Sequence, residues 1–143
     1  MRGIAVQTVT HKKIRAGLEH LEEVRSFVSE YALERHFAAA RVSEIELALE
    51  EAFANICNHA YPGEPGDIEV NCFTEDGDMV IEIIDSGVCF DMTKAEDPDI
   101  TADLSEREPG GLGIFLIKEL IDKVHYRREG DKNILRLYMA MRS

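Results

Sequence analysis

The stretch that decides the fold is residues 50–61, EEAFANICNHAY. Apolar residues recur through it at helical spacing, but glutamates, asparagines and a histidine interrupt them. Each helical step turns about 100°, so residues four apart lie almost above one another. Glu51, Asn55 and His59 therefore form one polar row along the helix. Glu50 lies one step around from this row and is expected to be a solvated side chain.

The polar row lies beside an apolar stripe of the same helix, so it should stand at the edge of the core. Buried polar groups cost free energy unless something bonds them, and Mg²⁺ accepts oxygen ligands while keeping several waters. The row by itself favours a plainer interpretation, namely hydrated side chains with weak i,i+4 hydrogen bonds. The stripe consists of Ile45, Leu49, Ala52, Phe53, Ile56 and Ala60.

The start and end of this helix also have sequence signals. Ser43 can cap its first turn, and Glu46 three residues later completes a capping box. Pro62 and Gly63 follow the last apolar position and end the helix. The sequence therefore predicts a helix that begins near Ser43 and stops before Pro62.

The rest of the chain predicts an α+β domain. The expected elements are a strand over 4–10, a helix over 15–33, the helix just described, strands over 67–74 and 78–85, a helix over 114–122, and strands over 123–130 and 133–141. Tight turns at Asp76-Gly77 and Gly130-Asp131 indicate hairpins. We expect one domain over 1–143, a two-layer sandwich whose mixed, mostly antiparallel sheet is covered by helices on one face. Repeated strand-helix-strand units are missing, which argues against a Rossmann fold.

Composition limits the classes of partner. The 143 residues carry 28 acidic and 16 basic side chains, a net charge of -12, which disfavours nucleic acid and anionic membranes as direct partners. The sequence shows neither a signal-peptide pattern nor a run long enough to cross a membrane. Three widely spaced cysteines without a CxxC pair predict reduced thiols in a cytoplasmic protein.

Two further motifs change the interpretation of the polar row. DSGVCFD, residues 85–91, follows an apolar strand, so the Asp85 carboxylate could accept a hydrogen bond from an amine such as that of adenine. Gly87 would let the backbone approach a flat ring. GGLG, residues 110–113, precedes an apolar helix, and free amides at a helix start attract phosphate. The long polar loop over 91–110 between these motifs is typical of a lid.

In this order, the three motifs resemble the Bergerat nucleotide-binding fold of the GHKL superfamily. The run GGLGIFLIKELIDKVHYRREGDKNILRLYM, residues 110–139, is especially similar to the anti-sigma-factor serine kinase branch. The resemblance covers nearly the whole chain and implies ATP and Mg²⁺ as cofactors. It also implies that the loop over 91–110 is the ATP lid.

The resemblance assigns roles to matching positions. It implies that Glu51 is the general base and that Asn55 coordinates Mg²⁺ on the ATP phosphates. It implies a functional arginine at Arg25. The nucleotide-binding positions that it implies are Asn55, Asp85, Gly87, Phe90, Gly110, Gly111, Leu112 and Gly113. His59 is expected only to cap the polar row.

The function that the resemblance implies is an ATP-dependent protein serine kinase that is also an anti-sigma factor. It would phosphorylate a STAS-type anti-sigma-factor antagonist and sequester a sigma factor, and it would be a homodimer. The alternative is a non-catalytic module in which ATP orders the lid and the ordered lid selects a protein partner. An ATPase subunit of a larger machine is a third reading. A histidine kinase is disfavoured, because the sequence presents no phosphoacceptor dimerisation helix upstream.

Overall fold

The structure, a computed structural model, describes residues 9–61, 66–94 and 111–141. Its strands are β1 (Thr10–Arg15), β2 (Asp67–Glu75), β3 (Asp78–Asp85), β4 (Lys123–Glu129) and β5 (Lys132–Ala140). Its helices are α1 (Leu21–Glu34), α2 (Ala39–Asn55) and α3 (Gly111–Leu120). Short helical turns are η1 (Leu18–His20), η2 (Ile56–Ala60), which is π-helical, and η3 (Met92–Lys94).

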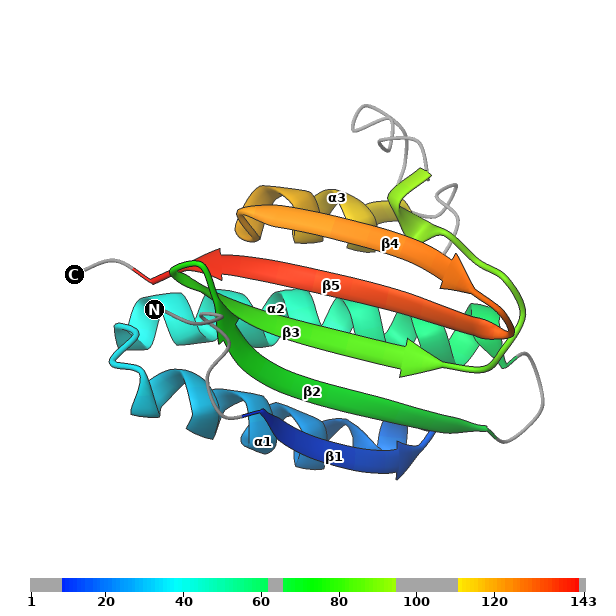
Figure 1. Cartoon of the computed structure of the whole chain (residues 1–143), viewed down its shortest axis with the longest axis horizontal. Helices are drawn as coiled ribbons and strands as arrows, with labels where there is room; N and C mark the ends of the chain where they lie inside the picture. The colour runs from blue at the N-terminus through cyan, green and yellow to red at the C-terminus, as the bar shows by residue number, and fades with distance from the viewer. Residues whose placement is uncertain (1–8, 62–65, 95–110, 142–143) are drawn as a thin grey trace, which may run out of the picture.

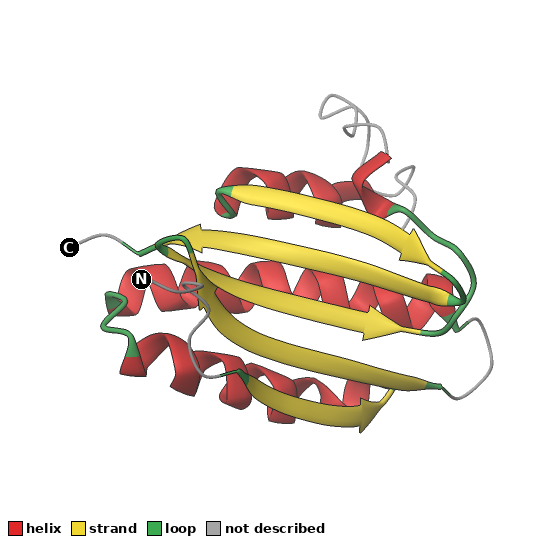
Figure 2. Ribbon diagram, in the orientation of Figure 1, coloured by secondary structure: helices red, strands yellow, loops and turns green. Residues whose placement is uncertain are grey.

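The described strands form one five-stranded sheet in the order β1-β2-β3-β5-β4. The three helices cover one face of this sheet, and the other face carries none of them (Figures 1 and 2). The expected α+β two-layer sandwich is therefore confirmed. Every pairing between these strands is antiparallel, so the sheet is not mixed. The apolar strand β3 is the central strand of the five.

The two predicted hairpin turns are present. Asp76 and Gly77 both have positive φ, 50° and 85°, as a two-residue turn of the primed type requires. Gly130 has φ 62° between β4 and β5. The pairing of β3 with β5 places Asp85, the last residue of β3, opposite Asn133.

The core lies between the helices and the covered face of the sheet. All six residues of the predicted apolar stripe are buried, with exposures of 0 to 3%. Ile114 and Ile117 of α3 join them, and Ile83 and Leu137 oppose them from the sheet. Each such side chain contributes about 1.5–3 kcal/mol on burial. This packing fixes α2 rigidly against the sheet, and α2 carries the polar row.

The start of α2 differs from its prediction. The helix begins at Ala39, so Ser43 lies inside it and does not cap it. Glu46 accepts a hydrogen bond from Ser29 of α1 instead of closing a capping box. Alanine is the best helix former, and the alanines before Arg41 extend the helix by one turn.

The N-terminal boundaries differ as well. β1 covers Thr10–Arg15, whereas most of the strand predicted over 4–10 lies outside the described residues. The helix predicted over 15–33 begins only at Leu21, after the turn η1. β1 continues through Arg15, which lies opposite Asp67 of β2 in the sheet. The side chains of Lys13 and Arg15 also form ion pairs with Asp67.

Candidate functional site

The second half of α2 carries the predicted polar row. Glu51 is half-buried, and Asn55 is buried with 4% exposure. The Nδ2 atom of Asn55 has no hydrogen-bond partner among the described residues. A buried polar atom without a partner costs about 1–3 kcal/mol, so Nδ2 of Asn55 is placed to donate to an acceptor that enters the site.

His59 does not continue this row. The last turn, η2, is π-helical, and its wider winding changes the direction of the side chains that follow Asn55. The His59 ring instead stacks on Phe90, with ring centroids 4.5 Å apart and an angle of 20° between the planes. The expectation that His59 caps the polar row is therefore wrong. The stack links the end of α2 to the loop after β3.

The first turn of α3 packs against the polar row. A Cβ atom added to Gly113 would lie 2.9 Å from Oε2 of Glu51 and 3.2 Å from Nδ2 of Asn55. Only glycine allows this close approach, so the start of α3 packs directly against the polar row. Gly111 is the first residue of α3 and Leu112 the second, whereas Gly110 and residues 95–110 of the predicted lid lie outside the described residues.

Replacement of Gly113 by alanine should disable the site without unfolding the protein. The new methyl group would push the flexible Glu51 carboxylate aside, while the buried Asn55 cannot move. We expect phosphoryl transfer to fall by at least about tenfold, because a misplacement near 1 Å has effects of this size or larger. The melting temperature should fall only slightly, because the better helix propensity of alanine offsets part of the cost of the tight contact with Asn55. Transfer assays and thermal melts of both proteins check this.

Asp85 ends β3 as a buried carboxylate with 3% exposure. Its Oδ1 atom accepts hydrogen bonds from the Gly87 amide at 2.9 Å and from Nδ2 of Asn133 at 2.8 Å. Burial raises the pKa of Asp85, and these two hydrogen bonds and the charge of Arg128 oppose the rise. Among the described residues both bonds end on Oδ1, so Oδ2 is the oxygen that can serve a ligand.

Gly87 has a structural role that the sequence did not predict. A Cβ at this position would lie 2.2 Å from the carbonyl oxygen of Ala60, so the loop after β3 touches the end of η2 through bare backbone. The amide of Val88 donates to the same carbonyl at 2.8 Å. The close approach holds Asp85 beside α2, and this requires glycine.

Arg25 lies on α1 and does not contact Glu51. Its guanidinium pairs with Glu22 on the same helix and with Glu50 of α2, the latter at 3.0 Å. Glu50 keeps 33% exposure of its side chain, so the expectation of a merely solvated residue is wrong. The sequence did not reveal this pair because it depends on how α1 packs against α2.

The residues that converge here fit a magnesium nucleotide. The unpaired Nδ2 of Asn55 can donate to a phosphate oxygen, and the amide oxygen of the same side chain is the atom that could hold a cation. Oδ2 of Asp85 can accept from a base amine. No group of three or more His, Cys, Asp or Glu residues that could hold a metal occurs within the described ranges. A magnesium ion at Asn55 would therefore take most of its ligands from phosphate oxygens and water, as is common for this ion.

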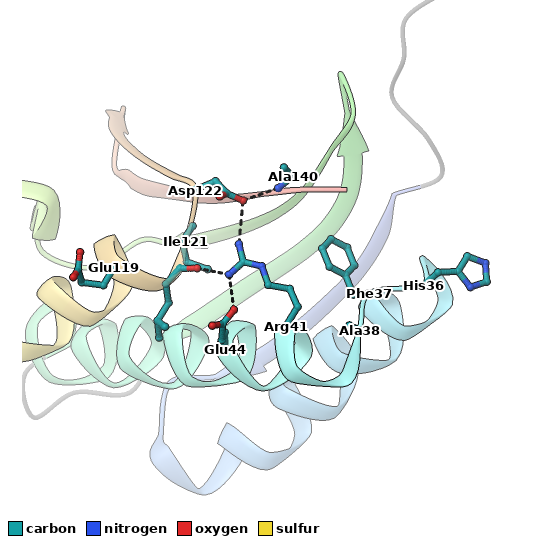
Figure 3. A pocket seen from close by; sticks show the side chains of 10 residues that line it. His36, Phe37, Ala38, Arg41, Glu44, Glu119, Ile121, Asp122 and Ala140 are labelled. Carbon is teal, nitrogen blue, oxygen red and sulfur yellow. Dashed lines mark hydrogen bonds and ion pairs between the residues drawn. The ribbon is translucent and has the colours of Figure 1, made fainter. Parts of the chain in front are cut away.

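A hollow lies at the other end of α2, with a cavity volume of about 540 Å³ (Figure 3). Arg41 crosses it and donates to Glu44, to the carbonyl of Leu120 at the end of α3, and to Asp122 at 3.0 Å. Asp122 also accepts from the Ala140 amide at 2.8 Å. This hollow is about 15 Å along α2 from Glu51, so it is separate from the polar row.

The contacts of Arg41 predict a structural role. Arg41→Ala should lower the free energy of unfolding by about 1 kcal/mol, because the carbonyl at the end of α3 and Asp122 lose a charged donor while both partners remain partly solvated. Nucleotide affinity should stay the same. Urea denaturation and nucleotide titration of the variant measure both quantities. Lys118→Ala, which removes an exposed cation of α3, is the control, and an equal loss in both variants would contradict the prediction.

Comparison with known proteins agrees with this geometry. Residues 14–139 match the family described as the histidine kinase-like ATPase domain. The serine/threonine-protein kinase BtrW of Bordetella bronchiseptica is 30% identical over 107 residues, which cover 74% of this chain and 75% of BtrW. The serine-protein kinase RsbW of Bacillus cereus is 28% identical over 127 residues, which cover 86% of this chain and 79% of RsbW.

Solved structures support the same fold. The crystal structure of the RsbU and RsbW domains of a Mycobacterium tuberculosis protein superposes with a TM-score of 0.66 at 17% identity. The match covers 94% of this chain and 33% of that one, so this chain spans about a third of that structure. A blue-light activated histidine kinase of Erythrobacter litoralis superposes with a TM-score of 0.53. Within the described part of the chain, no helix is both long and apolar enough to cross a membrane.

Proposed function

Because the chain belongs to the histidine kinase-like ATPase domain family, in the branch of the serine-protein kinases BtrW and RsbW, we propose that it is an ATP-dependent protein serine kinase. The observation that carries the proposal is the close approach of Gly113 to Glu51 and to the unpaired amide of Asn55, with Asp85 at the end of the central strand. These residues come from three separate elements.

Each residue has a distinct task in the proposed reaction. Asp85 accepts a hydrogen bond from the adenine amine, and Asn55 holds Mg²⁺ on the phosphates. The first amides of α3, near Gly113, stabilise negative charge on the transferring phosphoryl group. Mg²⁺, when held by the amide oxygen of Asn55, would supply further neutralisation of charge there.

Glu51 acts on the substrate in this proposal. It accepts the proton of a serine hydroxyl while the serine oxygen forms its bond to the γ-phosphorus and the bond from that phosphorus to the ADP oxygen breaks. Glu51 is half-buried, and its carboxylate lies beside Gly113 at the start of α3, where the phosphates are proposed to bind. Arg25 does not contact Glu51, so its proposed role would be to bind the partner or the phosphates from the side of α1.

We propose further that the substrate is a STAS-type anti-sigma-factor antagonist, and that the protein sequesters a sigma factor and forms a homodimer. The support is the similarity to RsbW and to the structure that contains RsbU and RsbW domains. Incubation of the protein with Mg-ATP and each STAS-domain protein of its host tests the substrate. ATP binding without phosphoryl transfer to any of these proteins would contradict the kinase proposal.

Sequestration of a sigma factor needs a separate test. Pull-downs from host lysate, with and without ATP, should recover a sigma factor in a nucleotide-dependent manner. Analytical ultracentrifugation should give twice the mass of the chain. Capture of a STAS protein alone, or a monomeric mass, would overturn the corresponding part of the proposal.

A further inference from the structure

Asn133 lies at the point where β5 leaves its turn, directly opposite Asp85 in the sheet. It is buried, with 4% exposure. Its Nδ2 atom donates to Oδ1 of Asp85 at 2.8 Å and to the carbonyl of Val88 at 2.9 Å. One amide therefore holds both the carboxylate and the loop that follows β3.

The other end of the same side chain is equally occupied. Oδ1 of Asn133 accepts from the Phe90 amide at 3.3 Å, from Arg128 at 3.2 Å and from the hydroxyl of Tyr126. Arg128 also donates to the carbonyl of Gly87 at 2.9 Å. The amide of Asn133 thus has a single orientation in which Nδ2 faces Asp85, because a reversed amide would place its donor against the Phe90 amide and Arg128 and its oxygen against the Asp85 carboxylate.

This orientation decides which oxygen of Asp85 a ligand meets. Asn133 and the Gly87 amide both donate to Oδ1, so this oxygen is held as an acceptor by the protein. A proton on the carboxyl group would sit on Oδ2 and turn the ligand-facing acceptor into a donor. We propose that Asn133 is a positioning residue that keeps Asp85 oriented and ionised, so that Oδ2 accepts the hydrogen bond of a nucleobase amine. This inference rests on the proposed nucleotide-binding function.

The consequence is a defined pH dependence of nucleotide binding. Burial raises the pKa of Asp85, and the hydrogen bond from Asn133 lowers it. Loss of that bond raises the pKa of Asp85. When the solution is acidified, the affinity for adenine should therefore begin to fall at a higher pH than in the wild type. The other titratable groups around Asp85 are Arg128 and Tyr126 on β4, Tyr61 and His59 at the end of α2, and Cys89 and Asp91 in the loop.

The test compares the wild type with Asn133→Leu and Asn133→Ala by calorimetric titration over a pH series. The probes are Mg-ATP and Mg-ITP, whose base carries an oxygen in place of the amine. We expect both variants to lose about tenfold in ATP affinity, consistent with the loss of one hydrogen bond to a charged group. ITP affinity should change less, and the pH midpoint of ATP binding should move upward.

Asn71→Leu is the matched control. Asn71 is also a strand asparagine with two side-chain hydrogen bonds, to His11 and Glu82, but it lies on the uncovered face of the sheet. It should leave the ATP-to-ITP ratio and the pH midpoint unchanged. A lower affinity for both nucleotides without movement of the midpoint would overturn the inference and leave Asn133 a purely structural residue. No binding of either nucleotide by the wild type would instead overturn the proposed function.

Discussion

Replacement of Glu51 by glutamine should reduce phosphoryl transfer to the protein substrate by about 10²- to 10⁴-fold, the usual contribution of a general base. Glutamine preserves the shape of the side chain above Gly113 but cannot accept the serine proton. ATP affinity should remain within about twofold, because the proposed nucleotide contacts come from Asp85, Asn55 and the start of α3. Single-turnover transfer from radiolabelled ATP and equilibrium titration of the same preparation measure the two quantities.

The choice of control for Glu51 follows from the structure. Glu50→Gln is not neutral, because Glu50 holds Arg25 at 3.0 Å across the two helices. Glu30→Gln is the better control, since Glu30 is an exposed glutamate of α1, and it should transfer phosphate normally. Full transfer by Glu51→Gln would show that another group takes the proton. A different result would favour the non-catalytic ATP-gated module. In that case the wild type would transfer no phosphate, and both the wild type and Glu51→Gln would switch partners when ATP binds.

The periodicity of the sequence was sufficient for most of the fold. The apolar stripe from Ile45 to Ala60 predicted the buried face of α2, and the Asp76-Gly77 turn predicted the hairpin of β2 and β3. These features depend on local spacing and turn chemistry, which a sequence displays directly. The start of α2 was missed because a serine with a glutamate three residues later has the pattern of a capping box even inside a helix.

The candidate site was predictable only in part. Glu51, Asn55 and Gly113 could be named from motifs, and the structure brings them together. Asn133 could not, because its role depends on Asp85, which is 48 residues away and meets it only through the pairing of β3 with β5. The stacking of His59 on Phe90 depends on a π-helical turn, for which the sequence carries no signal.

The second large effect is expected at Asp85. Asp85→Asn should lower ATP affinity by about 10- to 100-fold, because the amide nitrogen would replace Oδ2 and face the donor amine of adenine. The fold should persist, since the amide oxygen can still accept from Gly87 and Asn133 in place of Oδ1. Circular dichroism and calorimetric titration with Mg-ATP check the two parts separately.

The nucleotide profile distinguishes loss of this one hydrogen bond from general damage. ITP presents an oxygen where ATP presents an amine, so its affinity for Asp85→Asn should hold or rise while that of ATP falls. The pH dependence should also disappear: the buried carboxyl group of the wild type has a raised pKa and must be ionised to accept the amine, whereas an amide does not titrate. Equal losses for ATP and ITP would mean that Asp85 supports the loop from Gly87 to Phe90 without reading the base. In that case another residue of the site would have to recognise the base, because only an acceptor that meets the amine can favour ATP over ITP.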